Sequence, residues 1–477
     1  MHAAAENPVD ARFWQVRRKD LSALSPSQGG SSVMSQLTRF AKRRQAPLMG
    51  ATLLAAISFA APGEAVDIRN VIKETVKSNP LVLAELRETD ARNRQVRQAL
   101  AGYYPTLDLV AGYGFQERDP ANRTFANPSR TRNELERREL QLSARQLIFD
   151  GFYTPLEHKN QQARERSAKL RATSVGEDIS LSVTRAFTEV LKQEETLKLA
   201  QDTLAYHQEV YDKMSQRFQS GVGSRADFNQ ISSRLALSRT NLQNVTANLR
   251  NARINYQQVV GTFPGDGELE FPGSYHNYLP ANIEAAVARA FDNHPILKVA
   301  ETDLEATGYT YEQTKSAFYP RFDLEVERDA NDNIDGSEQK VDDLRVMLRM
   351  RYNLFRGGAD QARKQEFAYQ VEKAKEIRNN ARREVEQEIR LAWVANETLT
   401  AQIPVLIDYA ASSDETKKAY VDQFDLGRRT LLDLLNAENE SVSARRELIN
   451  AKHDLILNEY RIFHGMGDLM PTVGAEI

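Results

Sequence analysis

The sequence predicts a mixed α+β fold that is mostly helical and is built from two internal repeats. Two motifs recur in the same order: Tyr-Pro-x-x-Asp-Leu starts at Tyr104 and again at Tyr319, and Phe-x-x-Gly-x-x-Ser/Thr-x-x-Asp starts at Phe218 and again at Phe424. A repeat of this length indicates two copies of one supersecondary unit. Charged residues make up 27% of the 477 residues, with only 23 Gly and 16 Pro, which favours long polar helices over compact cores.

The first 65 residues are expected to lie outside the mature fold. A basic run at Lys42–Arg44 precedes a short apolar run and small residues ending at Ala65, which is typical of a signal peptide over 34–65. The apolar run is shorter than the ~20 residues that a spanning helix needs. Residues 1–33 have no signal character and are predicted to be a non-native extension, with a real leader segment as the alternative. The chain has no Cys, so a lipid-anchored N-terminus and a disulfide framework are excluded.

The first repeat is predicted over 66–274, the second over 275–468, and a tail over 469–477. Each repeat opens with two helices that meet at Asn79-Pro80 or His294-Pro295, where the residue before proline can cap and proline takes the first helical position. Tyr104-Pro105 then ends the helical pattern, because a residue before proline is held extended.

Strand hairpins are predicted over 104–150 and 319–355, where the hydrophobic period changes to two. In the second hairpin Leu344, Val346 and Leu348 alternate with Arg345, Met347 and Arg349, so one face is apolar and the other is mostly charged. The alternation within any single strand would also fit a soluble β-sandwich. Two isolated hairpins, however, offer no second sheet to cover their apolar faces. Transmembrane strands need ~9–11 residues, apolar outward and polar inward. Four strands cannot close a barrel, whereas a homotrimer in outer-membrane lipid would supply twelve.

After each hairpin comes a long polar helix, Thr154 to Ser220 and Asp360 to Asp425, each spanning about 100 Å. Pro404 is expected to interrupt the second. Gly221 and Gly427 can take the left-handed conformation that ends a helix. Ser224-x-x-Asp227 and Thr430-x-x-Asp433 are capping-box patterns that start the return helices. The first return helix carries an apolar stripe at heptad spacing from Phe228 to Val259, which predicts antiparallel coiled-coil packing.

With these features the chain resembles the TolC family of outer-membrane efflux and type I secretion channels, the outer membrane factors. The resemblance covers about 66–468 and is carried by Asn79-Pro80, the segment 104–109, Tyr319-Pro320, 354–358 and 427–435. It implies a trimeric twelve-stranded transmembrane β-barrel, four strands per protomer, continued by a helical coiled-coil tunnel through the periplasm. It also implies a location in the cell outer membrane.

The resemblance implies a passive exit duct that works with a periplasmic adaptor (membrane fusion) protein and an inner-membrane ABC or other transporter. Because the lipid-anchored Cys is missing, type I secretion of a large protein such as an adhesin is the first expectation. The alternative cargo is drugs or small molecules in an efflux pump. An alternative of another class is a periplasmic coiled-coil adaptor or structural protein, which would need a lipoyl-like sandwich that 101–153 does not resemble.

Nothing in the sequence predicts an enzyme. There is no Gly-rich phosphate loop, no acid–base or metal-ligand cluster and no cofactor motif, so no catalytic, cofactor or metal residues are expected. A net charge of −3 gives no reason to expect nucleic acid. His207 and His453 are predicted to be surface residues of helices.

The resemblance implies that the helix-turn tips contact the adaptor. The simpler interpretation is that the Gly, Ser/Thr and Asp residues only build capped turns; Arg428 and Arg429 are not needed for capping, so contact is favoured there. The candidate tip residues are Phe218, Gly221, Ser224, Asp227, Phe424, Gly427, Arg428, Arg429, Thr430 and Asp433.

Two further groups are candidates for the duct itself. Asp414 and Glu415 are candidate gate carboxylates, because a threefold axis would gather like charges, raise their pKa values and favour cations; a solvated helix face is the alternative. The residues expected to line the barrel lumen are Asp108, Arg145, Arg321, Asp323, Glu325, Arg345, Arg349 and Arg351.

Overall fold

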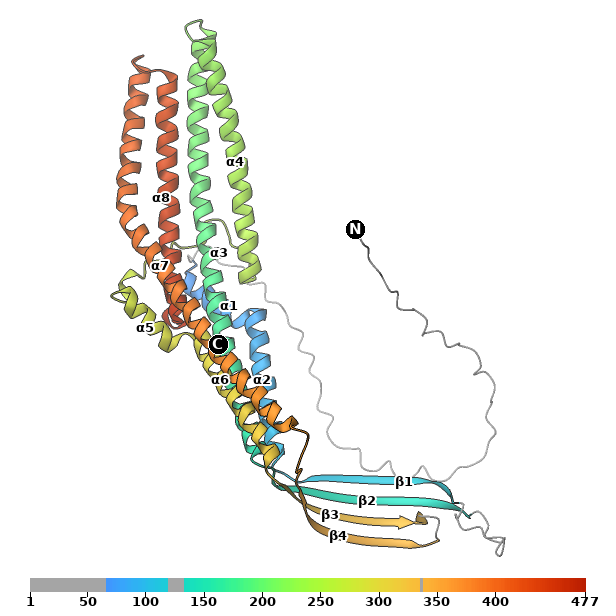
Figure 1. Ribbon diagram of the computed structural model, residues 1–477. Helices are drawn as coiled ribbons and strands as arrows, with labels where there is room; N and C mark the ends of the chain where they lie inside the picture. The colour runs from blue at the N-terminus through green and yellow to red at the C-terminus, as the bar shows by residue number, and fades with distance from the viewer. Residues whose placement is uncertain (1–65, 119–132, 335–337) are drawn as a thin grey trace, which may run out of the picture. The chain divides into compact units, whose positions relative to one another are not determined.

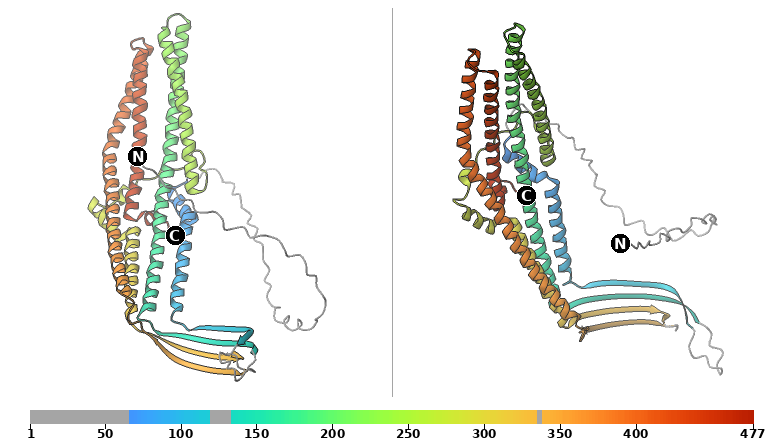
Figure 2. Two further views of the ribbon diagram at one scale, coloured as in Figure 1. Left: turned by 45° about the vertical axis from the view of Figure 1, so that its right-hand side comes forward. Right: turned by 45° about the horizontal axis from the view of Figure 1, so that its top comes forward.

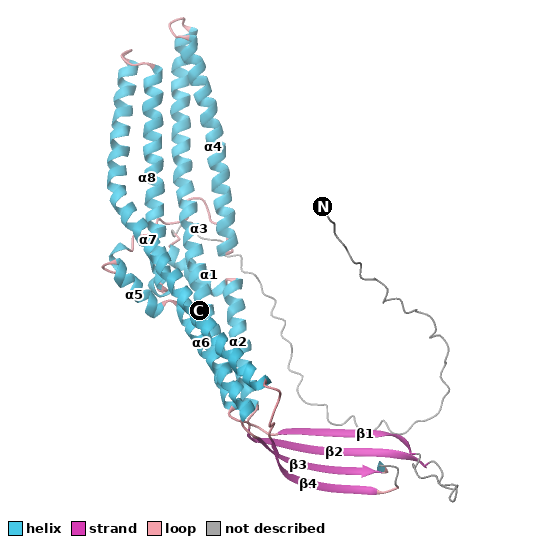
Figure 3. Cartoon of the chain, in the orientation of Figure 1, coloured by secondary structure: helices cyan, strands magenta, loops and turns pink. Residues whose placement is uncertain are grey.

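The computed structural model describes residues 66–118, 133–334 and 338–477, so the predicted extension 1–33 and signal peptide 34–65 lie outside the described residues. The helices and strands follow one another in the same order in both halves (Figures 1 and 3). The first half comprises α1 (Ile68–Ser78), α2 (Pro80–Ala101), β1 (Thr106–Arg118), β2 (Asn133–Phe149), α3 (Tyr153–Gln219) and α4 (Arg225–Val260). The second comprises η1 (His276–Tyr278), α5 (Ile283–Asn293), α6 (Pro295–Thr314), η2 (Lys315–Phe318), β3 (Arg321–Asp332), β4 (Lys340–Arg351), α7 (Ala359–Asp425), α8 (Leu431–Met466) and α9 (Leu469–Val473).

The paired opening helices form as predicted. Asn79 accepts a hydrogen bond from the Leu81 N–H at 2.9 Å, and Pro80 occupies the first turn of α2. His294 takes the same place before α6, where its Nδ1 accepts from the Ile296 N–H at 3.2 Å. The side chain before proline therefore caps the second helix in both halves, which confirms the equivalence of the two sites.

The strands form one antiparallel sheet in the order β1-β2-β3-β4. The prediction of two isolated hairpins was wrong, because β2 of the first half pairs with β3 of the second from Arg138↔Asp332 to Phe149↔Phe322. Pairing satisfies the backbone N–H and C=O groups of both strands, which a bilayer would leave without partners. Within the described residues, β1 and β4 pair on one side only, so each leaves one open edge.

The long helices α3 and α7 each contain 67 residues. The prediction that Pro404 interrupts the second long helix was wrong, because α7 continues through this residue. A proline removes only one backbone hydrogen-bond donor, and packing along α8 stabilises the rest of α7. Helices α3 and α4 lie side by side, as do α7 and α8 (Figures 1 and 2). On α4 the predicted stripe is buried at Ile231, Leu235, Val245 and Leu249, which confirms the coiled-coil packing. None of the helices in the described part of the chain combines the length and hydrophobicity needed to cross a bilayer.

The main hydrophobic core lies where α1, α5, α9 and the ends of α4 and α8 pack on the middle of α3 and α7. Phe187, Ile389, Tyr460 and Met466 are among its fully buried side chains. A second, smaller cluster near the helix tips joins the two hairpins through Met214, Phe424 and Leu434. Each repeat therefore depends on the other for burial of its apolar residues.

The residues predicted as a tail, 469–477, are docked in this core. The buried Glu177 carboxylate accepts hydrogen bonds from the Leu469 and Met470 N–H groups, both at 3.1 Å, so it fixes the start of α9. Beside it, Gly176 allows close approach, because a β-carbon there would lie 2.6 Å from the Met470 sulfur. We call Glu177, His464 and residues 469–473 the C-terminal clasp.

Two groups of the clasp have shifted pKa values. Burial raises the pKa of Glu177 to about 7. Burial opposes the charge on His464, but hydrogen bonds to Asp178 at 2.9 Å and Glu388 at 3.3 Å more than offset it and raise its pKa to about 9. Neighbouring His294 is the opposite case, because burial lowers its pKa to about 4.

The clasp should therefore weaken as the pH rises from 6.5 to 9. The protons on Glu177 and His464 stabilise the clasp, and both are fully bound below the ordinary pKa values of these residues. The proton on Glu177 is lost as the pH rises through about 7, and the proton on His464 is lost as it rises through about 9. We expect the melting temperature, followed by the fluorescence of Trp393 in the adjoining core, to fall on the order of 2 °C over this range. His464→Gln should flatten the dependence, and an unchanged pH profile in this variant would show that His464 is not its source.

Candidate functional site

The predicted lumen residues all lie on one face of the sheet. Directly opposite residues of paired strands share a face, and the register pairs Arg145 with Glu325, Asp323 with Arg349 and Arg321 with Arg351. Asp108 and Arg345 lie on the same face, because one row of opposite residues crosses all four strands. The row runs from Asp108 on β1 through Ser143 on β2 and Glu327 on β3 to Arg345 on β4. The structure thus brings these side chains together on one surface.

The charges on this face neutralise one another. Asp323, which is fully buried, accepts from Arg321 at 3.0 Å and from Arg351 at 3.2 Å. Glu325 accepts hydrogen bonds from Arg349 at 2.6 Å and from Arg351 at 2.8 Å, and it forms a salt bridge with Arg145 at 3.2 Å. Such a network holds long side chains against the sheet and limits the net field that a passing solute would meet.

The other face of the sheet is apolar and bare. Its side chains are 60–77% exposed on the outer strands, at Leu107, Leu109, Tyr113, Phe115, Leu344, Val346, Leu348 and Met350. A contiguous apolar surface of this kind marks contact with a membrane or a partner. The alternation of the two faces matches that of transmembrane β-barrels.

Both helix tips end in the same turn. Gly221 and Gly427 have φ of 79° and 75°, the left-handed region that glycine adopts without strain. The N–H that follows each glycine returns to the last turn of the helix, from Val222 to the Arg217 carbonyl at 3.0 Å and from Arg428 to the Gln423 carbonyl at 2.8 Å. These are Schellman motifs, so the glycines have the predicted structural role.

The return helices start differently. Thr430 and Asp433 form a full capping box, with the Asp433 N–H donating to Thr430 Oγ1 and the Thr430 N–H donating to the Asp433 carboxylate, both at 3.2 Å. The same prediction for Ser224 and Asp227 was wrong. Ser224 Oγ accepts instead from the Ala226 N–H at 3.1 Å, one residue earlier, and Asp227 lies in the first turn, where a negative charge favours the helix dipole.

The aromatic residues of the tips make contacts within the tips. Phe424 is only 6% exposed and packs under the Arg217 guanidinium, 5.1 Å from its ring centroid, while Phe218 stacks on Phe228 at 5.1 Å. A salt bridge from Lys213 to Asp425 at 3.4 Å joins the two hairpins nearby. Phe424 therefore stabilises the tips from inside, whereas Phe218, which is 38% exposed, also forms part of their surface.

The exposed surface of the tips is partly apolar and partly basic. Val222 is 84% exposed and Leu426 is 73% exposed. Arg429 is held over the Tyr420 ring at 4.2 Å, whereas the Arg428 side chain has no hydrogen bond or ion pair to any described residue. Val222 and Leu426 were missed in the sequence; the signal was an apolar residue beside the glycine of each turn, where a loop would be polar.

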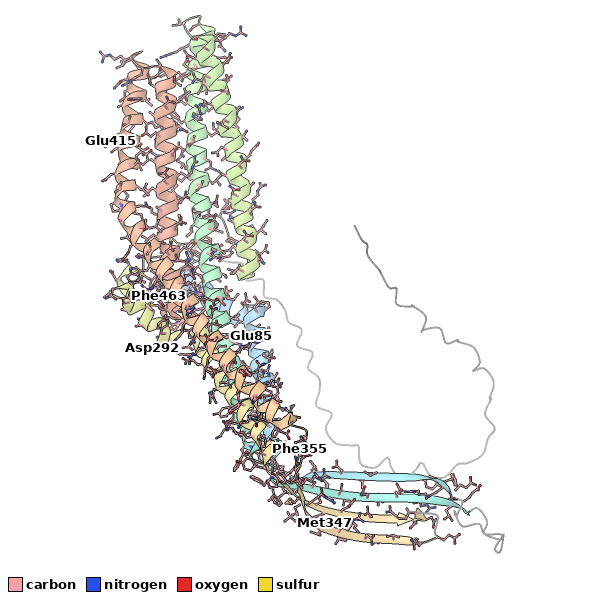
Figure 4. All side chains as sticks on the ribbon, in the orientation of Figure 1. Glu85, Asp292, Met347, Phe355, Glu415 and Phe463 are labelled. Carbon is pink, nitrogen blue, oxygen red and sulfur yellow. The ribbon has the colours of Figure 1, made fainter. Side chains whose placement is uncertain are left out.

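The two candidate gate carboxylates lie in different surroundings. Asp414 faces α8, where it accepts from Ser441 Oγ at 2.5 Å and from Arg445 Nε at 2.9 Å. Burial opposes its charge, but these bonds to Arg445 and Ser441 lower its pKa below the usual range. Glu415 is exposed on the upper half of α7 (Figure 4). In the single protomer the pKa of Asp414 is therefore lowered, whereas the gate interpretation expected it to be raised by like charges around a threefold axis.

The prediction that His207 and His453 lie on the surface was wrong. His453 is 2% exposed and packs against Phe271, with ring centroids 5.2 Å apart. His207 bonds to Ser238 Oγ at 2.9 Å, and burial lowers its pKa to about 4. Both positions lie on the packed side of their helices, which composition alone does not reveal.

A family model described as outer membrane efflux protein matches residues 71–262 and 286–467. The chain belongs to the outer membrane efflux protein family. The predicted resemblance to the TolC family is therefore confirmed.

Three relatives of this family member illustrate its range. BepC, an outer membrane efflux protein of Brucella suis, is 25% identical over 68% of this chain and 70% of its own. TolC of Escherichia coli is 22% identical over 86% and 84%. AprF, an alkaline protease secretion protein of Pseudomonas aeruginosa, is 21% identical over 80% of each chain.

Among solved structures, CusC has a TM-score of 0.73 at 15% identity over 86% of this chain and 95% of its own. The predicted fold class is confirmed: a TolC-like protomer, mostly helical, with four strands of a β-barrel and long helices built from two repeats. This family member lies in the outer membrane with its helical part in the periplasm, as predicted. The adaptor alternative would need a lipoyl-like sandwich over 101–153, and the described part of that segment instead contains β1 and β2 of the four-stranded sheet, which removes support for this alternative.

The apolar face has the character of a lipid-facing surface and the charged face that of a barrel lumen. Exposed aromatic side chains mark the junction of the sheet and the helices, among them Phe152, Tyr319 and Phe355, the last labelled in Figure 4. Aromatic residues favour the boundary between lipid and water because their rings are apolar and their edges tolerate polar groups. The junction therefore has the composition expected at a boundary between lipid and water.

Proposed function

We propose that this chain is the outer-membrane exit duct of a tripartite export system and that it assembles as a homotrimer. The single observation that carries the proposal is the four-stranded sheet, with one bare apolar face, one charge-neutralised face and open edges at β1 and β4. Three such sheets joined edge to edge would form twelve strands and satisfy every edge. The duct is passive, requires no cofactor and carries out no reaction.

We further propose that the cargo is a large protein exported by type I secretion. The relative AprF, named for alkaline protease secretion, supports this assignment. A multidrug or small-molecule efflux pump is the second candidate, and the name of BepC favours it. Deleting the gene and measuring both the secreted proteins in the culture medium and the sensitivity of the cells to drugs separates the two candidates.

The proposed partners are a periplasmic adaptor and an inner-membrane ABC or other transporter. The exposed surface of the tips, Val222, Leu426 and Arg428, supports an adaptor contact, because these side chains are neither buried nor used for capping. The buried Phe424 would act indirectly by holding its turn in place, whereas Phe218, which is 38% exposed, would also add to the contact surface. Glycines 221 and 427 would have the same indirect role.

The first test is the native mass of the protein extracted from outer membranes in mild detergent. A trimer is expected, because four strands leave two open edges and only a closed barrel removes them. A stable monomer in the membrane extract would contradict the proposed duct. If a trimer is found, cross-linking between β1 of one protomer and β4 of the next would identify the edges that meet.

The gate assignment gives a separate prediction. We expect Glu415→Ala to weaken the block of channel current by divalent cations several-fold, since its exposed carboxylate remains available to a cation. Asp414→Ala should weaken it less, because Arg445 already neutralises Asp414. Asp202→Ala, an exposed carboxylate on α3, serves as the control; unchanged block in the Glu415 variant would remove it from the gate.

A further inference from the structure

A polar recess of about 500 Å³ lies in the helical wall next to the sheet. Its walls come from the first turns of α3, from the end of α6 with η2, and from the start of α7. A neighbouring hollow shares Tyr153 and Arg356 with it and includes Arg321 and Arg351. Because those two arginines lie on the charged face of the sheet, the recess adjoins the face that we propose lines the duct.

The recess contains hydrogen-bond acceptors that the described residues do not satisfy. Asn160 is 2% exposed, and its Nδ2 donates to the Ala306 carbonyl at 2.8 Å and to Thr310 Oγ1 at 2.6 Å. Its Oδ1 is buried without a donor, and so is Oε1 of Gln161, whose Nε2 donates to Glu157 at 2.7 Å. Buried acceptors without a donor are rare in native proteins and indicate a missing group that carries N–H or O–H.

The recess is also basic. Arg164 and Arg363 line it, and neither has a carboxylate partner within the described ranges. The acidic residues nearby are already engaged: Asp360 pairs with Arg356 at 3.5 Å, and the second oxygen of Glu157 accepts from Gln313 at 2.6 Å. Two guanidinium groups therefore remain available for an anion.

We propose that this recess binds an extended acidic segment of the polypeptide in transit. Its carboxylates would pair with Arg164 and Arg363, and its backbone N–H groups would donate to Asn160 and Gln161. An extended chain offers an N–H at each residue, which a simple inorganic anion does not. The inference rests on the proposed export of a protein cargo and adds the chemistry of a binding subsite in the duct wall, present three times in a trimer.

The test uses single trimers in a planar bilayer, with hexa-aspartate added on the side of the strand loops. From that side the peptide reaches the recess through the barrel without passing the helix tips. Half-maximal block of the current should require about tenfold more peptide in the double variant Arg164→Gln/Arg363→Gln, because charge-assisted hydrogen bonds are the strongest contacts available there. The matched control, Lys159→Gln/Lys364→Gln, removes the same charge from neighbouring positions outside the recess and should behave as wild type.

The results separate the inference from the proposed function. Equal block in wild type and in the Arg164/Arg363 variant would overturn the subsite, and so would equal block by inorganic phosphate at the same concentration. If wild type forms conducting trimers that hexa-aspartate does not block, the subsite fails while the duct stands. If wild type forms no channel, the duct itself fails.

Discussion

Replacing Val346 with arginine is expected to prevent the protein from accumulating as an assembled duct. Val346 is 63% exposed on β4, between Leu344 and Leu348 on the apolar face of the sheet. An arginine on the lipid face of a barrel costs about 2–4 kcal/mol near the middle of the bilayer, and each protomer of a homotrimer would bear that cost. Membrane fractionation followed by native electrophoresis should show little trimer in the outer membrane and more degraded or unassembled chain.

The neighbouring residue supplies the control. Met347 is opposite Glu325 in the sheet register and therefore lies on the charged face (Figure 4). Met347→Arg introduces the same side chain at almost the same height, but into water and beside a carboxylate. It should assemble like wild type, with any effect confined to conductance. Equal loss of both variants would indicate a general folding defect and would argue against lipid on the Val346 face.

The sequence predicts the parts of this fold that depend on local pattern. The change of period from 3.6 to 2 locates the strands, because side chains alternate between faces there. The same alternation assigns Asp323 and Arg349 to one face and Val346 to the other, and the register agrees. The helix ends at Asn79, Gly221 and Gly427 follow from short-range preferences of the backbone.

What the sequence does not predict depends on contacts between distant segments. The pairing of β2 with β3 joins the two repeats, and no local pattern distinguishes it from two separate hairpins. Glu177 resembles a solvated glutamate until the N–H groups of Leu469 and Met470 are seen to meet it. The burial of His453 and the pairing of Asp414 with Arg445 depend on which side of each helix its neighbours cover.

The tips give the second large prediction. Arg428→Glu is expected to abolish export while leaving the trimer and its conductance intact. The Schellman turn uses only the backbone N–H of this residue, and its side chain contacts no described partner by hydrogen bond or ion pair. Reversing the charge should therefore disrupt only a partner surface, because like charges facing each other across an interface oppose binding. The measurements are secreted cargo in the medium and co-purification of the adaptor with the duct.

A matched charge reversal tests whether the position or only the net charge matters. Lys418 is exposed on α7, several turns away from the tip, so Lys418→Glu changes the net charge of the chain equally. It should export normally if the adaptor binds at the tips. Normal export by the Arg428 variant would remove that residue from the contact and leave Val222 and Leu426, the other exposed tip residues, as the surface to test. Loss of trimer in the Arg428 variant would instead mean that its side chain stabilises the turn, contrary to the role that the backbone geometry assigns to it.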